Sequence, residues 1–260
     1  MEFFDSHAHY NDEKFDEDRW ETIKKVYEEG NVKKIVTVGY DIDSSKKAIE
    51  IANKIDYVYA TIGVSPNDVP ASLEKWEIEF NELEKMVNSK KIVAIGEIGL
   101  DYYWNKENKE LQKRVFKDQI KFANKLNLPI VIHTRDAYVD TISVLKEELP
   151  VKKGIFHCCP QNRELIKEAL ELGFYISFAG PITFKNSKNA EDVSKMVPLD
   201  KLLIETDSPY LSPEPKRGKR NDSSNLQYIA KRIAEFKGIS IEEVANATYK
   251  NACKIFALTN

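Results

Sequence analysis

The residues with the most distinctive chemistry in this sequence are its histidines. The chain of 260 residues contains only 4 of them: His7, His9, His133 and His157. His7 and His9 lie one residue apart in DSHAH. Alternate side chains of a β-strand point to the same side, so both imidazoles would face one spot. Neutral imidazole is a ligand of zinc and other transition metals, and the pair therefore predicts a metal site.

Two carboxylates extend this candidate set. Glu97 lies in GEIGLD, after a nearly all-apolar run, and Asp207 lies in ETDSPY. A carboxylate buried there must be paired or bound to a cation. Four imidazoles and two carboxylates are too many for one tetrahedral ion. They fit two divalent ions, about 3.5–4 Å apart, that share a carboxylate. Taken singly, each histidine could instead cap a loop, Glu97 could be a loop residue, and Asp207 could form an Asx turn.

The elements that must position these residues are short apolar runs rich in Val, Ile, Phe or Tyr, which predict buried strands. Eight such runs begin near residues 3, 34, 57, 91, 129, 154, 174 and 202. Amphipathic stretches follow most of them; Ala48, Ile51, Ala52 and Ile55, for example, form a helical stripe. Alternating strands and helices predict a parallel sheet with right-handed crossovers. We therefore expect a single-domain (β/α)8 TIM barrel over residues 1–260, with a doubly wound open sheet as the alternative.

The candidate ligands fall at the predicted carboxyl ends of the strands. His7 and His9 end the first strand, Glu97 the fourth, His133 the fifth, His157 the sixth and Asp207 the eighth. Active sites of α/β barrels lie at this end. The barrel prediction therefore gathers all six residues at one site.

Basic residues near these positions predict an anionic substrate. Arg135 lies two residues beyond His133, and its guanidinium could fork onto a phosphate. After the last predicted strand, KRGKRN supplies further cations, where barrels often bind phosphate. These cations are Lys216, Arg217, Lys219 and Arg220. The alternative is a solvated run of charges.

Seven stretches together resemble the TatD family of metal-dependent hydrolases, which belongs to the amidohydrolase-like barrels. They are DSHAH, GEIGLDYYW, PIVIHTRDA, GIFHC, GFYISFAGPITFKN, LLIETDSPYLSP and RGKRN, and they span residues 5 to 221 in family order. The resemblance implies a first metal held by His7, His9, Glu97 and Asp207. It implies a second metal held by Glu97, His133 and His157, with Glu97 bridging. It also implies a deoxyribonuclease with 3′→5′ exonuclease character that depends on a divalent ion such as Zn, Mn, Mg or Ni.

One loop departs from the family pattern. The family usually has GVHPHD after the third strand, whereas this chain has GVSPND, with Ser65 and Asn67 in place of histidines. We expect these two residues to contact the substrate or the leaving group. They can donate hydrogen bonds but cannot become cationic near neutral pH.

The expected reaction is phosphodiester hydrolysis, with Asp207 and Glu97 as the catalytic carboxylates. Asp207 would orient the attacking water and accept its proton, while Arg135 would stabilise charge on the phosphate. Tyr210 and the aromatic residues of DYYW could stack a terminal base, although Tyr102, Tyr103 and Trp104 could equally form a plug over the barrel rim. Two alternatives are a hydrolase of another ester or amide bond, such as an aminoacyl-tRNA deacylase, and a metal-bound scaffold without catalysis.

Composition sets bounds on location and partners. The net charge of −3 excludes a global basic field, so binding of DNA would depend on a local patch. The 3 cysteines, two of them adjacent, make a poor disulfide framework and favour a reducing compartment. We find no signal peptide or membrane-spanning run, and we expect a cytoplasmic protein with no membrane association and no obligate protein partner.

Overall fold

The computed structural model describes residues 1–259 and contains eight parallel strands. The strands are β1 Phe3–Ala8, β2 Val32–Val38, β3 Val58–Ile62, β4 Ile92–Asp101, β5 Ile130–Arg135, β6 Gly154–Phe156, β7 Tyr175–Phe178 and β8 Leu202–Ile204. They pair in sequence order from β1–β2 to β7–β8. The segment after β8 returns to β1, because the Asp207 N–H donates to the His7 carbonyl at 2.9 Å. The fold is therefore a (β/α)8 barrel, and the alternative of an open sheet is wrong.

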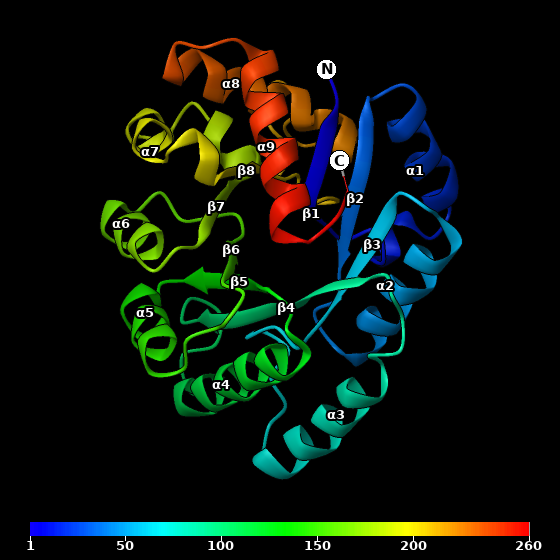
Figure 1. The fold of residues 1–260 in the computed structure, drawn as a ribbon, viewed down its shortest axis with the longest axis vertical. Coiled ribbons are helices and arrows are strands. Elements are labelled where there is room, and N and C mark those ends of the chain that lie inside the picture. The colour runs from blue at the N-terminus through cyan, green and yellow to red at the C-terminus, as the bar shows by residue number, and fades with distance from the viewer. Residues whose placement is uncertain (260) are drawn as a thin grey trace.

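Helices surround the strands in the same order. They are α1 Arg19–Glu28, α2 Ile42–Lys54, α3 Leu73–Lys85, α4 Lys109–Leu126, α5 Tyr138–Glu147, α6 Arg163–Glu171, α7 Ala190–Met196, α8 Leu226–Lys237 and α9 Ile241–Ile255. Four short 3-10 helices are η1 Glu13–Phe15, η2 Gly180–Thr183, η3 Leu199–Lys201 and η4 Ser223–Asn225. Figure 1 shows the chain running around the ring in sequence order, with α1 to α8 outside the strands. The helical stripe predicted near residue 48 is confirmed, since Ala48, Ile51 and Ala52 are buried on α2.

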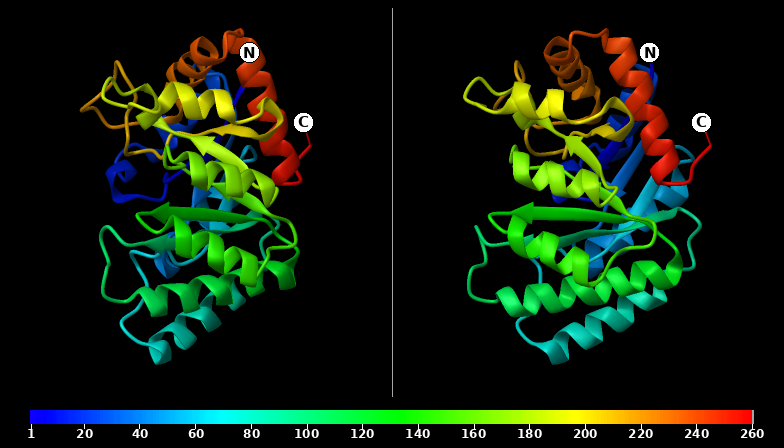
Figure 2. Two further views of the ribbon diagram at one scale, coloured as in Figure 1. Left: turned by 90° about the vertical axis from the view of Figure 1, so that its left-hand side faces the viewer. Right: turned by 60° about the vertical axis from the view of Figure 1, so that its left-hand side comes forward.

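Two apolar cores stabilise this arrangement. The larger core lies between the helices and the outer face of the strands. The smaller core contains buried strand residues such as Phe4, Val93 and Leu203. They pack together with Cys253 of α9 and with Phe256, which directly follows this helix. Each such buried side chain contributes about 1.5–3 kcal/mol. Helix α9 thereby closes the amino end of the barrel, and the strand arrows in Figure 2 point away from it.

Two strand ends differ from the expectation. We expected Glu97 to end the fourth strand, but β4 continues to Asp101, so Glu97 lies inside the strand. The pairing of β4 with β5 shifts between Ile95 and Ile98, and such an irregularity re-aims a side chain without ending the strand. The eighth strand ends at Ile204, so Asp207 lies in the following loop.

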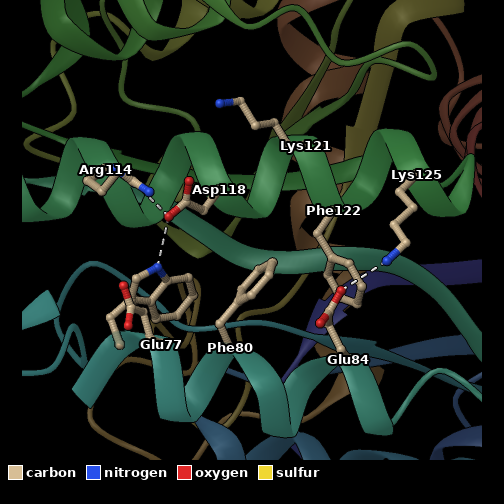
Figure 3. Close-up of a pocket in the computed structure, with 9 residues that line it drawn as sticks. Glu77, Phe80, Glu84, Arg114, Asp118, Lys121, Phe122 and Lys125 are labelled. Atoms are coloured by element: carbon tan, nitrogen blue, oxygen red, sulfur yellow. Dashed lines mark hydrogen bonds and ion pairs between the residues drawn. The ribbon is translucent and has the colours of Figure 1, made fainter. Parts of the chain in front are cut away.

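A cavity of about 350 Å³ opens between α3 and α4 on the outside of the barrel. Trp76, Phe80 and Phe122 supply its aromatic lining. Figure 3 shows Phe80 and Phe122 between the two helices. At its rim, the Trp76 indole donates to Asp118 at 3.0 Å and Lys125 pairs with Glu84 at 3.1 Å. None of the candidate site residues lines this cavity. None of the helices within residues 1–259 is both long enough and apolar enough to span a membrane.

Candidate metal centre

The first group of candidate ligands comes from β1, β4 and the loop after β8. The Nε2 atoms of His7 and His9 lie 3.1 Å apart. Glu97 Oε2 lies 3.3 Å from His7 Nε2 and 3.7 Å from His9 Nε2. Asp207 Oδ1 lies 3.5 Å and 3.2 Å from the same two nitrogens. Four potential ligand atoms thus converge on one point. The spacing of the two histidines in DSHAH predicted that their imidazoles would face the same place.

The second group uses the other oxygen of the same glutamate. Glu97 Oε1 lies 2.9 Å from His133 Nδ1 and 3.4 Å from His157 Nε2. The two imidazole nitrogens lie 3.3 Å apart. Each oxygen of Glu97 therefore faces a different set of nitrogens, which is the arrangement of a bridging carboxylate.

The geometry of both groups fits divalent cations. Ligand atoms on a tetrahedron at about 2.0–2.2 Å from zinc lie about 3.3–3.6 Å from one another. The distances between ligand atoms range from 3.1 Å to 3.7 Å in the first group and from 2.9 Å to 3.4 Å in the second. The first group supplies four ligand atoms, whereas the second supplies three and leaves a position for water or substrate. The donor set of imidazole and carboxylate suits Zn, Mn, Ni or Fe.

The local backbone aims Glu97 into the barrel. The Glu97 N–H donates to the Gly39 carbonyl at 2.7 Å, within the irregular part of β4. A Cβ at the preceding Gly96 would lie 2.5 Å from the Val131 Cβ, so only glycine lets β4 approach β5 closely there. The sequence GEIG thus supplies both the ligand and the close strand contact that directs it.

The loop after β8 holds Asp207 in an uncommon conformation. Its φ is +55°, in the left-handed region, where aspartate is tolerated better than most residues. Its N–H is fixed by the His7 carbonyl, and the N–H of His9 donates to the Ser208 carbonyl at 2.6 Å. These two backbone bonds tie Asp207 to the end of β1, where His7 lies on the strand and His9 directly follows it.

Two buried carboxylates behind the histidines were missed by the sequence analysis. Glu205 Oε1 lies 3.2 Å from His157 Nδ1 and accepts the Cys158 N–H at 2.6 Å. Asp101 Oδ2 lies 2.9 Å from His133 Nε2. Such carboxylate–histidine pairs fix the orientation of an imidazole whose other nitrogen faces a metal. The signal was present in ETD and GLDYY, since each carboxylate lies close in sequence to a candidate ligand.

Glu205 also belongs to a third group of potential ligands. Ligand atoms of His7, His157 and Glu205 lie within 4.8 Å of one another. Two atoms of this group, His7 Nδ1 and Glu205 Oε2, are buried without a hydrogen-bond partner. His7 and Glu205 lie beneath the cavity floor, since neither lines the cavity described below, whereas His157 does.

The electrostatics of the cluster favour a bound cation. Burial favours the neutral acid, yet the imidazoles of His157, His133 and His7 hold the pKa of Glu97 well below its ordinary value. Burial disfavours a charged imidazole, yet Glu97 and Glu205 raise the pKa of His157 well above its ordinary value. Burial lowers the pKa of His7, with His157 adding to the effect. Anionic carboxylates are thus kept in a buried place, and protons or metal ions must balance their charge.

A cavity of about 940 Å³ opens above these ligands. Its lining includes every candidate ligand except His7, which lies beneath it. It also includes four of the residues predicted to contact substrate: Ser65, Asn67, Arg135 and Tyr210. The Ser65 hydroxyl donates to Asp68 at 2.6 Å. The two residues that replace the usual histidines therefore lie in the wall of this cavity.

The remaining predicted phosphate contacts lie in a separate groove. Arg217, Lys219 and Arg220 line a neighbouring groove of about 500 Å³. Arg220 forks onto Asp18, with contacts of 2.8 Å and 2.5 Å, so it already has a carboxylate partner. Sequence alone could not foresee this pair, which joins residues 202 positions apart.

The aromatic residues after β4 are not uniformly packed. Tyr102 is buried, whereas Tyr103 and Trp104 are 46% and 69% exposed, so a packed plug describes only Tyr102. The Arg135 guanidinium lies 3.8 Å from the centre of the Tyr103 ring and 5.5 Å from that of Trp104. Trp104 lines the large cavity. An exposed aromatic and cationic stack therefore borders the candidate centre.

The chain is similar to known proteins over almost its whole length. A family model described as TatD related DNase matches residues 4–257. The uncharacterized metal-dependent hydrolase YabD of Bacillus subtilis (strain 168) is 44% identical over 256 residues, which cover 98% of this chain and 99% of that protein. A hydrolase of the TatD family from Entamoeba histolytica is 28% identical, with a TM-score of 0.86 and coverage of 100% of this chain and 99% of that one. The TatD homolog YJJV from Escherichia coli K12 shares the fold, with a TM-score of 0.92 at 24% identity over 99% of this chain and 98% of that one.

Proposed function

Because this chain belongs to the TatD related DNase family of metal-dependent hydrolases, we propose that it is a deoxyribonuclease with 3′→5′ exonuclease character. We propose that two divalent ions of Zn, Mn, Mg or Ni take part. The observation that carries the proposal is the position of Glu97, whose Oε2 faces His7 at 3.3 Å and whose Oε1 faces His133 at 2.9 Å. One carboxylate between two sets of imidazoles is the arrangement of two-metal hydrolysis.

The two ions would supply activation of water and neutralisation of charge on the phosphate. Asp207 lines the cavity, and although burial opposes ionisation, His9 and His7 lower its pKa. It is therefore ionised near neutral pH and can accept the proton of the attacking water. Glu205 and Asp101 would hold the His157 and His133 rings in place through the contacts described above.

The cavity wall supports a phosphate-containing substrate. Arg135 offers a planar guanidinium at the rim, and its pairing with Tyr103 would limit the entropy lost when it binds an anion. Trp104 and Tyr210 are exposed aromatic residues that line the same cavity and could stack a terminal base. A neutral amide or ester substrate would not use this combination of cation and aromatic rings.

Three cysteines, Cys158, Cys159 and Cys253, are free thiols in the described residues. They support our proposal of a reducing, cytoplasmic location.

The proposal is tested by following release of nucleotides from end-labelled single-stranded DNA by the metal-loaded protein. Asp207→Asn should reduce the rate at least about 100-fold, since removal of a general base costs this much or more. Asp200→Asn changes an exposed aspartate and is the matched control, with an unchanged rate. Release by the Asp207→Asn variant at the parent rate would refute the role of Asp207. If none of the four ions supports release of nucleotides, the proposal that this protein is a deoxyribonuclease is refuted.

A further inference from the structure

A compact group of lysines lies at the end of the barrel opposite the candidate metal centre. Lysine pairs directly precede two strands: Lys90 and Lys91 precede β4, and Lys152 and Lys153 precede β6. Parallel strands all begin at one end of the barrel, and β5 is the neighbour of both β4 and β6. Residues 127–129, which lead into β5, carry no charge. The two pairs therefore lie in one sector of the amino end.

The positive charge of this sector is only partly compensated. Within residues 1–259, none of the four lysines makes a salt bridge at a limit of 4.0 Å. Lys90 and Lys152 are exposed, whereas Lys91 donates to the Asp56 carbonyl at 2.7 Å, which places one acidic residue beside the group. Glu148, in the connection into β6, is already paired with a lysine of α4 at 3.8 Å. An excess of positive charge remains in a protein whose net charge is −3.

Two exposed apolar side chains lie in the same connection as the second lysine pair. Leu149 and Val151 are 44% and 66% exposed, and they flank Pro150 directly before Lys152. Single exposed apolar residues are common on protein surfaces. Two of them on one turn, next to cations without a carboxylate partner, form a surface that is both apolar and basic. We call these two residues and the four lysines the amino-end patch.

The turn that carries Leu149 and Val151 is held in shape by the protein itself. The Asn124 side chain of α4 donates to the Leu149 carbonyl at 3.3 Å and accepts the Val151 N–H at 2.7 Å. The Lys153 N–H donates to the Pro150 carbonyl at 3.2 Å and closes the turn. Because the backbone is fixed before a partner arrives, less entropy is lost on binding.

We propose that the amino-end patch docks onto an anionic lipid surface, with Leu149 and Val151 entering the boundary between headgroups and acyl chains. Attraction of lysines to anionic lipid and burial of apolar side chains are the two contributions that hold peripheral proteins on membranes. A nucleic acid would match the lysines but would leave the aliphatic side chains without a partner. The inference does not depend on the proposed nuclease function.

Docking of this kind needs no membrane-spanning segment. We expected no membrane association because no run of residues is long and apolar enough to span a bilayer, whereas a protein that lies on the surface needs no such run. The proposed cytoplasmic location fits the inference, since the cytoplasmic leaflet carries anionic lipids that attract basic surfaces. The cavity of about 940 Å³ opens at the other end of the barrel, so it would face away from the membrane.

The contribution of charge is tested by sedimentation of the protein with vesicles of phosphatidylcholine, either pure or mixed with phosphatidylglycerol. The metal-loaded protein is freed of excess ion before the assay. Lys90→Ala/Lys152→Ala removes two exposed lysines of the patch, and Lys188→Ala/Lys231→Ala removes two exposed lysines elsewhere as the matched control. The patch variant should bind the mixed vesicles about 10- to 30-fold more weakly than the parent, because each lysine near an anionic surface contributes about fivefold. The control should match the parent.

The contribution of the apolar side chains is tested with Leu149→Ser/Val151→Ser in the same assay. This variant should bind about tenfold more weakly than the parent, since less apolar surface is buried, and its binding should still weaken as salt is raised. Ile78→Ser is the control, because Ile78 on α3 is also 66% exposed, and its affinity should not change. Thermal unfolding checks that each variant is folded.

Three results would overturn the inference. The first is equal affinity of the parent for pure phosphatidylcholine and for mixed vesicles, or no binding to either. The second is that a patch variant binds as tightly as its control. The third is that polyglutamate competes with the mixed vesicles as effectively at equal charge, which would point to an acidic protein partner. Release of nucleotides from DNA by the same variants should be unchanged, so failure of the docking and failure of the proposed nuclease are read separately.

Discussion

The carboxylate behind His157 gives a prediction about one metal ion of the pair. Glu205 Oε1 lies 3.2 Å from His157 Nδ1 and accepts the Cys158 N–H at 2.6 Å. Glu205→Gln keeps a carbonyl oxygen that can still accept from Cys158, so the loop after β6 should keep its shape. The change removes the negative charge beside the imidazole. His157 should therefore become a weaker and less well oriented ligand.

The size of the effect follows from the contact that is lost. Removal of a partner behind a metal-bound histidine costs about 10- to 100-fold in metal affinity, or about 1.4–2.7 kcal/mol. The Nε2 atom of His157 belongs to the second group of ligands, through Glu97 Oε1 and His133. The first group, built around His7 and His9, has no hydrogen bond to Glu205. Glu205→Gln should therefore weaken only one of the two metal-binding steps.

The assay is a titration of metal-free protein with Mn²⁺ or Zn²⁺, followed by calorimetry or by competition with a chromophoric chelator. The parent should show two steps, and Glu205→Gln should shift one of them by the stated factor. Asp101→Asn should act on the same step, since Asp101 supports His133 of the same group. Circular dichroism and thermal unfolding of the metal-free variants serve as controls for folding. Equal shifts of both steps, or no shift, would refute the assignment of Glu205 to one ion.

Three further predictions follow from the same geometry. Metal affinity should fall in acid by about tenfold per pH unit for each proton that the metal displaces. The reason is that the pKa of His157 is raised, so protons compete with the metal below that pKa. An affinity, measured by chelator competition, that does not change between about pH 5.5 and 7.5 would contradict this. Gly96→Ala should lower the free energy of unfolding by about 1–3 kcal/mol, since its Cβ would lie 2.5 Å from that of Val131; unchanged urea unfolding would show that the strands can separate. Arg135→Ala should raise KM for DNA about tenfold, with a smaller effect on kcat. Arg135→Lys should recover only part of the loss, because lysine cannot reproduce the planar contact with Tyr103. Full recovery by lysine would argue for charge alone.

The fold could be predicted from sequence because its signals are local. Short runs of β-branched residues predict buried strands, and the stripe on α2 predicts a helix with one buried face. The boundaries were less accurate where tertiary contacts decide them. The strand around Glu97 continues to Asp101 because its pairing with β5 resumes at Ile98 after an irregularity. No local pattern reveals where a neighbouring strand resumes pairing.

The candidate site, like the fold, could be predicted from sequence only in part. Six candidate ligands could be grouped from sequence alone. His7 and His9 alternate in DSHAH, and barrel sites lie at the carboxyl ends of the strands, where the other four were also expected. Their partners Glu205 and Asp101 depend on side-chain orientation across strands, which sequence spacing does not fix. The pairing of Arg220 with Asp18 depends on the path of a long loop. For this reason the predicted basic run proved to contain both paired and unpaired cations.

The central claim, that two bound ions at a shared glutamate support hydrolysis of DNA, is tested most directly by one titration. Metal-free protein is loaded with increasing equivalents of Mn²⁺, and the rate of nucleotide release from single-stranded DNA is measured at each ratio. The account predicts a rate that rises to a plateau at about two ions per chain, as two groups of ligands joined by Glu97 require. A plateau at one ion, or no release of nucleotides at full loading, would contradict it.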